Sequence, residues 1–315
     1  MDFVGKRRWF FISSGVFIIV GLLSLAIPPA LHLGIDFTGG STISVKFETP
    51  VSQEAVKNEL IKLRHPEATI QNSGNTDYFI RTITLKEGNV LTGAPSERVQ
   101  LETALGELGT IDRTPEFSSV GGVIARDTVR NSIIIVFAAA IAILLFITYA
   151  FRGVPSSFRF GVAAIIALVH DLLIVLGIFS ILGKLVDLEV NAMFITGLLF
   201  VIGYSVNDTI VVFDRIRENV TRSPGQPIEL SVNNSILESL GRSLTTSLTL
   251  LFTILTLLFL GGESIRNFLI VLLIAVISGT YSSICIASQV LVSWEKGEVG
   301  KILRILPFFS SRSKV

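Results

Sequence analysis

The sequence predicts an α-helical membrane protein with six transmembrane helices and one small α+β domain outside the membrane. Half of the 315 residues are hydrophobic and only 16% are charged. The mean hydropathy of +0.67 is atypical of a soluble enzyme. Six apolar runs are long enough to cross about 30 Å of hydrocarbon, which takes about 20 residues. One long, more polar stretch separates the first run from the other five, and it predicts the outer domain.

The six apolar runs are the predicted transmembrane helices. They cover residues 9–30, 131–151, 159–183, 191–213, 243–260 and 267–292. The first run follows Lys6, Arg7 and Arg8, as in a secretory signal peptide, but it exceeds the apolar core of about 7 to 15 residues of such peptides. We therefore expect it to be an uncleaved anchor.

The distribution of basic residues predicts the orientation, because Lys and Arg in short loops resist translocation. Thirteen of them lie in the tails and short loops on the side of both termini, and only Lys184 and Arg266 lie on the other side. Both termini are expected in the cytoplasm. This divides the chain into an N-terminus with the first helix (1–30), an extracytoplasmic domain (31–130), a five-helix membrane bundle (131–292) and a cytoplasmic tail (293–315).

The extracytoplasmic domain has a readable pattern of strands and helices. A strand (40–48) is followed by a capped helix (52–63), two strands around TIQNS and DYFIRTITL, a second helix (96–108) and a last strand (110–120). This order predicts a ferredoxin-like split βαβ fold. The domain contains no cluster of acid, base and nucleophile, so we expect no enzyme and neither a cofactor nor a metal.

The overall charge argues against a nucleic-acid-binding protein, and the single cysteine argues against a disulfide or a cysteine metal site. A net charge of +1 leaves no basic surplus for binding nucleic acid. Cys285 stands alone in an apolar run, so it forms no intrachain disulfide and no CxxC metal site.

Polar residues inside the membrane are the candidate functional groups, because a charge there costs several kcal/mol and usually serves function. Asp171 lies about 18 Å along its helix from Arg159, which is roughly mid-membrane. Asp208 lies about 10 Å along its helix from Arg215, toward the membrane interior. His170, next to Asp171, is either a proton relay or a partner in a hydrogen bond between helices. Asn207 and Asp208 are together an alternative site for sodium.

The fifth apolar run carries a polar stripe that starts at Arg242. Its other members follow at steps of three and four residues: Thr246, Thr249, Thr253 and Thr256. The stripe either packs against a neighbouring helix or lines a hydrated path, in which Thr246 and Thr249 are possible relays. Arg242 and Asp208 lie on the same side of mid-membrane and meet if their helices are neighbours. A carboxylate that alternates between an arginine partner and a proton has the chemistry of a proton carrier, and the alternative is a permanent ion pair.

Four motifs resemble the SecF family of the bacterial Sec export machinery. They are LGIDFTGGS (33–41), VHDLLIVLGIFS in the third apolar run, VIGYSVNDTIVVFDRIREN in the fourth and RSLTTSLT (242–249) in the fifth. The resemblance covers nearly the whole chain and implies a location in the bacterial cytoplasmic (inner) membrane. It also implies half of a resistance-nodulation-division type unit, which SecD completes to twelve helices.

The resemblance further implies an activity, partners and site residues. The complex associates with the Sec channel SecYEG, often with YajC, and uses the proton motive force to promote export of an unfolded preprotein through the lipid bilayer. The family's coupling residues correspond to Asp208 and Arg242. Asp36, Gly39 and Gly40 fall in its junction motif, where a structural role in the turn competes with a role in coupling.

Two rival classes share parts of this pattern. A half-subunit of a proton-driven efflux transporter for small molecules or lipids has the same membrane fold, but relatives of that kind carry much larger outer domains. A purely structural scaffold does not need Asp208, Asp171 and Arg242 within lipid.

Overall fold

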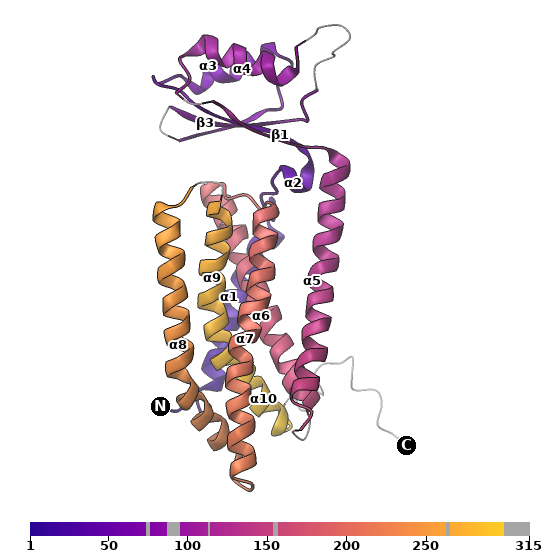
Figure 1. The fold of residues 1–315 in the computed structure, drawn as a ribbon, viewed down its shortest axis with the longest axis vertical. Helices are drawn as coiled ribbons and strands as arrows, with labels where there is room; N and C mark the ends of the chain where they lie inside the picture. Colours follow the sequence, from indigo (N-terminus) through magenta and orange to yellow (C-terminus); the bar gives the residue numbers. More distant parts are fainter. Residues whose placement is uncertain (74–75, 87–94, 113, 154–156, 263–264, 299–315) are drawn as a thin grey trace. The chain divides into compact units, whose positions relative to one another are not determined.

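A computed structural model of the chain describes all residues except 74–75, 87–94, 113, 154–156, 263–264 and 299–315. Contacts divide the chain into two units (Figure 1). One comprises Met1–His32 and Ile133–Val315, and the other comprises Leu33–Ser132. Most of the predicted cytoplasmic tail lies outside the described residues.

The described residues contain six spans that are long and apolar enough to cross a membrane, which is the number predicted. Five are single helices: α1 (Arg7–Ala26), α5 (Gly122–Ala150), α6 (Ser157–Val186), α7 (Ala192–Arg222) and α8 (Ile228–Leu260). The sixth combines α9 (Arg266–Ser282), the π-helix η2 (Ser283–Ala287) and α10 (Ser288–Glu295).

The centre of the membrane unit consists of α6, α7 and α9. In Figure 1, α7 lies beside α9 and α8, and α6 packs against α1 and α9. Of the most apolar 18-residue stretch in each span, 50% is buried in α6, 50% in α7 and 72% in the last span. The buried share is only 17% in α8, 11% in α1 and 6% in α5. Three helices therefore keep most of their surface for lipid or for another protein.

Two small residues bring α1 close to α6. A Cβ atom on Gly21 would lie 2.9 Å from the Cα of Gly177, a distance that side-chain carbons do not tolerate. One turn further along, the hydroxyls of Ser24 and Ser180 are 2.8 Å apart. This is the small-residue packing that membrane helices use for close approach.

The fifth membrane helix begins earlier than predicted. We expected it to start at residue 243, but α8 starts at Ile228 and α7 continues to Arg222, so most of the segment between the fourth and fifth apolar runs is helical. The polar segment before residue 243 is amphipathic, and it buries Val232 and Ile236 in the same core as Phe213. That burial stabilises a helix that hydropathy alone does not reveal.

The second unit has the ferredoxin-like fold that was predicted. Its strands β1 (Gly40–Lys46), β2 (Thr69–Ser73), β3 (Asp77–Thr82) and β4 (Glu116–Val120) form an antiparallel sheet in the order β2-β3-β1-β4. Helices α3 (Gln53–Lys62) and α4 (Glu97–Leu108) cover one face of the sheet (Figure 1). The side chains of Ser52 and Ser96 cap them by accepting hydrogen bonds from Ala55 and Val99, as expected for helix N-termini.

Candidate functional site between the membrane helices

Asp171 lies where α6, α7 and α9 meet. Its side chain is fully buried and accepts hydrogen bonds from three hydroxyls: Ser205 of α7 (2.6 Å to Oδ2), Ser278 of α9 (2.6 Å to Oδ1) and Ser282 of α9 (2.7 Å to Oδ2). The Nδ1 atom of His170 lies 3.1 Å from Oδ1. Both oxygens of this buried carboxylate are therefore satisfied, and Asp171 joins three helices.

Asp208 lies on the same face of α7 as Ser205, about 4.5 Å further along the helix axis. Its side chain is also buried, with 7% exposure, and Oδ1 accepts a 2.7 Å hydrogen bond from Ser243 of α8. The Oδ2 atom is buried and has no hydrogen-bond partner among the described residues. Unlike Asp171, Asp208 has an oxygen available for a second donor or for a proton.

Hydroxyl groups surround the two carboxylates. The Thr209 hydroxyl lies 2.9 Å from that of Ser283 in the π-helix. The Ser247 hydroxyl of α8 lies 2.6 Å from that of Thr280 in α9 and 2.9 Å from that of Tyr204 in α7. Such groups hydrogen-bond across membrane helices, and here they tie α8 to its two neighbours next to Asp208.

Arg242 does not pair with Asp208 in this conformation. Helices α7 and α8 are neighbours, as the expected pair requires, but the Arg242 side chain is exposed. Its guanidinium has no ion-pair or hydrogen-bond partner among the described residues. Ser243 faces Asp208 instead, because adjacent residues point about 100° apart around a helix.

The threonine stripe of α8 also faces away from the packed centre. Thr246 and Thr249 are exposed and donate hydrogen bonds to the carbonyl groups of Arg242 and Thr245 in their own helix. The buried stripe consists of serines that recur every four residues: Ser231, Ser235, Ser239, Ser243 and Ser247. This spacing is visible in the sequence and makes Ser243 a candidate, but it does not tell which of the two stripes faces inward.

Two further candidates occupy different environments. Asn207 is exposed while Asp208 is buried, so this conformation does not bring them together as a sodium site. The Nε2 atom of His170 is buried without a partner among the described residues, and its ring lies 6.1 Å from that of Tyr281. Within the described residues, no three His, Cys, Asp or Glu side chains are grouped as a metal site requires.

The junction motif belongs to the ferredoxin-like unit, and its backbone explains its glycines. Asp36 lies in the first turn of the short helix α2 (Ile35–Thr38), which the sequence did not predict. Gly39 and Gly40 have φ angles of 73° and 126°, where side chains are strained. A Cβ on Gly40 would also lie 2.6 Å from the carbonyl oxygen of Thr82. This geometry favours the structural role of the two glycines.

Comparisons with known proteins agree with these motifs. The family described as "Protein export membrane protein SecD/SecF, C-terminal" matches residues 100–297. The family described as "SecD/SecF GG Motif" matches residues 29–51, which include Gly39 and Gly40. The first match includes Asp171, Asp208 and Arg242, and the second includes the junction motif.

Several relatives match over nearly the whole chain. The protein translocase subunit SecF of Thermobaculum terrenum is 43% identical over 96% of this chain and 97% of its own length, and that of Anaerolinea thermophila is 39% identical over 95% of each. The translocase subunit SecDF of Bacillus subtilis is 32% identical over 95% of this chain and 39% of its own length.

A solved structure extends the comparison to the fold. The crystal structure of SecDF from Thermus thermophilus, described as a translocon-associated membrane protein, is 33% identical and superposes with a TM-score of 0.80. The match covers 94% of this chain and 39% of that one. The chain therefore belongs to the SecF family of protein translocase subunits.

Proposed function

We propose that this SecF-type subunit couples the proton motive force to protein export, and that Asp208 carries the proton. The observation that carries the proposal is the buried Oδ2 atom of Asp208, which has no partner among the described residues. A buried ionised carboxylate needs partners for both oxygens, whereas a neutral carboxyl group needs fewer. Asp208 is therefore suited to gain and lose a proton within the membrane.

Arg242 is the proposed partner of the ionised form of Asp208. It directly precedes Ser243, whose hydroxyl contacts Asp208 here, so the two residues lie within about 1.5 Å of each other along the axis of α8. Asp171 is the second proposed coupling residue, and His170, Asn207, Thr246 and Thr249 are possible relays. Asp36, Gly39 and Gly40 support the connection to the outer domain.

SecD is the proposed partner within the membrane. The relative from Bacillus subtilis carries SecD and SecF in its name, and this chain matches 39% of its length. Exposed polar groups support the same partner: Arg242, Thr246, Thr249 and Asn207 all lie on the surface of the unit. Since an arginine facing lipid costs several kcal/mol, a second protein is expected to cover this surface.

The remaining parts of the proposal concern location and larger assemblies. We place the complex in the bacterial inner membrane with both termini in the cytoplasm, because basic residues concentrate on that side. The Sec channel SecYEG, the emerging unfolded preprotein and YajC are its proposed partners, together with membrane lipids. An efflux function is not favoured, because the matching relatives are named as protein translocase subunits.

The function can be tested in vesicles that hold the chain, a SecD-type partner and the Sec channel. Preprotein export would be measured with an imposed proton gradient, with an imposed sodium gradient and with neither. We expect only the proton gradient to stimulate export. Stimulation by sodium alone would refute the choice of ion, and no stimulation by either would refute the coupling function.

A further inference from the structure

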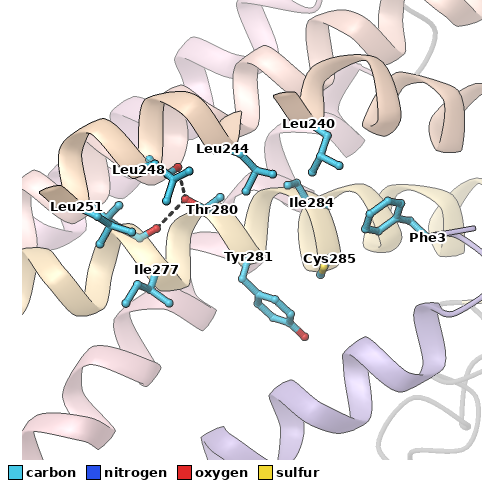
Figure 2. Close-up of a pocket in the computed structure, with 12 residues that line it drawn as sticks. Phe3, Leu240, Leu244, Leu248, Leu251, Ile277, Thr280, Tyr281, Ile284 and Cys285 are labelled. Atoms are coloured by element: carbon cyan, nitrogen blue, oxygen red, sulfur yellow. Dashed lines mark hydrogen bonds between the residues drawn. The ribbon is translucent and has the colours of Figure 1, made fainter. Parts of the chain in front are cut away.

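A groove lies along α9, between α8 and the segment that precedes α1. Its volume is about 310 Å³. Figure 2 shows Leu244 and Leu248 of α8 on one wall, Ile277 of α9 on the other, and Phe3 at one end. Leu248 and Ile277 are 50% and 57% exposed. The groove therefore opens at the surface of two membrane spans, where the surrounding medium is hydrocarbon.

The hydroxyl groups that line the groove already have partners. Those of Ser247 and Thr280 lie 2.6 Å apart. The Tyr281 hydroxyl donates to the carbonyl oxygen of Phe10 and accepts from the hydroxyl of Ser14, each at 3.1 Å. A polar ligand would leave its own donors and acceptors unpaired here, at a cost that a hydrocarbon chain does not have. The lining therefore favours a hydrocarbon ligand.

Size and position argue against a helix of another protein in the groove. One turn of an α-helix with its side chains is about 10 Å wide and 5.4 Å long, so it occupies roughly 400 Å³, which exceeds the volume of the groove. Leu244 and Leu248 each follow a residue of the proposed SecD surface, Arg242 and Thr246, by two positions. They point about 200° away from it around α8. The SecD surface and the groove therefore lie on different sides of α8.

The N-terminus of α1 has the properties of an anion site. Its N-cap residue is Lys6, no side chain caps the helix, and no acidic residue lies in the first turn. A helix N-terminus carries a partial positive charge that attracts phosphate. Lys6 is exposed, and its ammonium group has no ion-pair or hydrogen-bond partner among the described residues. The nearby carboxylate of Asp2 accepts a 2.7 Å hydrogen bond from the backbone of Gly5.

This positive end lies beside the groove. The ring of Phe3, which lines the groove, stacks on that of Phe10, and Phe10 meets the edge of Tyr281, with 6.3 Å between centroids in each pair. Lys6 lies four residues before Phe10 and therefore on the same face of α1, about 6 Å nearer the N-terminus. Phe17, also on that face, is 65% exposed. In the proposed orientation, this end of α1 is at the cytoplasmic leaflet, which carries anionic lipids.

We propose that the groove binds one acyl chain of an anionic phospholipid, whose phosphate is held by Lys6 and the N-terminus of α1. The two parts of the site match the two parts of such a lipid: an apolar groove within the membrane and an unneutralised positive charge at its surface. The site is separate from Asp208, and the proposal does not depend on proton coupling.

Native mass spectrometry tests the site on the full chain with its co-expressed partner in detergent. The complex is titrated with phosphatidylglycerol and with phosphatidylcholine that carries the same acyl chains. Leu248→Trp fills the groove and should remove one bound phosphatidylglycerol, whereas Leu145→Trp on α5, where the leucine is 64% exposed, should keep it. Lys6→Gln should weaken phosphatidylglycerol binding about five-fold, which is the contribution of one basic residue at a membrane surface. Lys57→Gln, at an exposed position of α3, is its control.

Three outcomes would overturn the proposal. An unchanged number of bound phosphatidylglycerol molecules in Leu248→Trp would exclude a lipid from the groove; Ile277→Trp, on the opposite wall, serves if the first variant does not assemble. Equal affinities of the native complex for the two lipids would refute the anionic headgroup. Loss of a protein partner rather than of a lipid from the groove variants would show a protein interface. Gradient-driven export by Asp208→Asn tests the proposed function separately.

Discussion

Replacement of Asp171 by alanine should destabilise the membrane unit strongly, because it removes one acceptor that joins three helices. Three serine hydroxyls on α7 and α9 would lose their bonds to it. Interhelical hydrogen bonds in membranes are worth about 0.6 kcal/mol each on average, whereas bonds to a charged group are worth about 1.5 kcal/mol or more. The expected loss in the free energy of unfolding is therefore about 2 to 5 kcal/mol.

The assay is denaturant titration of the purified complex in mixed micelles, followed by the loss of tertiary structure. Asp171→Asn should fall between the native chain and Asp171→Ala, because the amide keeps one carbonyl acceptor. Asp214→Ala is the matched control, since Asp214 is 65% exposed and its contact with Arg217 is 3.5 Å long. Its cost should stay within about 0.5 kcal/mol. An equal, small loss for Asp171→Ala and Asp214→Ala would refute the role of Asp171 as the junction of α6, α7 and α9.

Three further predictions concern packing, backbone and pH. Gly21→Ala should weaken the contact of α1 with α6, because the added Cβ meets the backbone of Gly177. In the control Gly15→Ala, the added Cβ meets nothing within 4 Å. The Gly21 variant should therefore unfold at a lower temperature than the Gly15 variant, and equal unfolding temperatures would contradict the close approach. Gly40→Ala should destabilise the ferredoxin-like unit by about 1 to 3 kcal/mol, because alanine is strained at that φ; unchanged hydrogen exchange in β1 would contradict this. A backbone hydrogen bond at Glu67 lowers the pKa of the Glu67 carboxyl group below the ordinary 4.5, and neighbouring side chains have smaller effects. The ionised carboxylate therefore stabilises the fold above pH 4.5, and this stabilisation is lost as the pH falls through the lowered pKa. Glu67→Gln should flatten the acid dependence of hydrogen exchange in that unit, and an unchanged profile would count against the shift.

The order of elements was predictable because each rests on local signals. The apolar runs are long enough to identify six spans. Ser52 and Ser96 are typical N-cap residues, and they identify the starts of the two helices in the ferredoxin-like unit. The start of α8 was not predictable from hydropathy, because the segment from Ile228 to Arg242 mixes buried apolar residues with polar ones. Its helical form depends on packing against α7, which is a tertiary effect.

The site was predictable in its residue types but not in its geometry. Spacing places Arg242 and Thr246 on one face of a helix, yet it does not tell which of two adjacent polar stripes faces inward. The serine stripe was the buried one, so Ser243 rather than Arg242 contacts Asp208. The partners of Asp171 come from α7 and α9, which are distant in sequence, and only the fold brings them together.

Export by Asp208→Asn is the measurement that tests the central claim most directly. Vesicles with the variant, its partner and the Sec channel would be compared with native vesicles, with and without an imposed proton gradient, at equal amounts of assembled complex. The amide keeps the size of the side chain and can still accept from Ser243, but it cannot ionise. We predict that complex assembly and gradient-independent export persist while stimulation by the gradient is lost. Full stimulation of the Asn variant would contradict the account, because the proton would then be carried by another group.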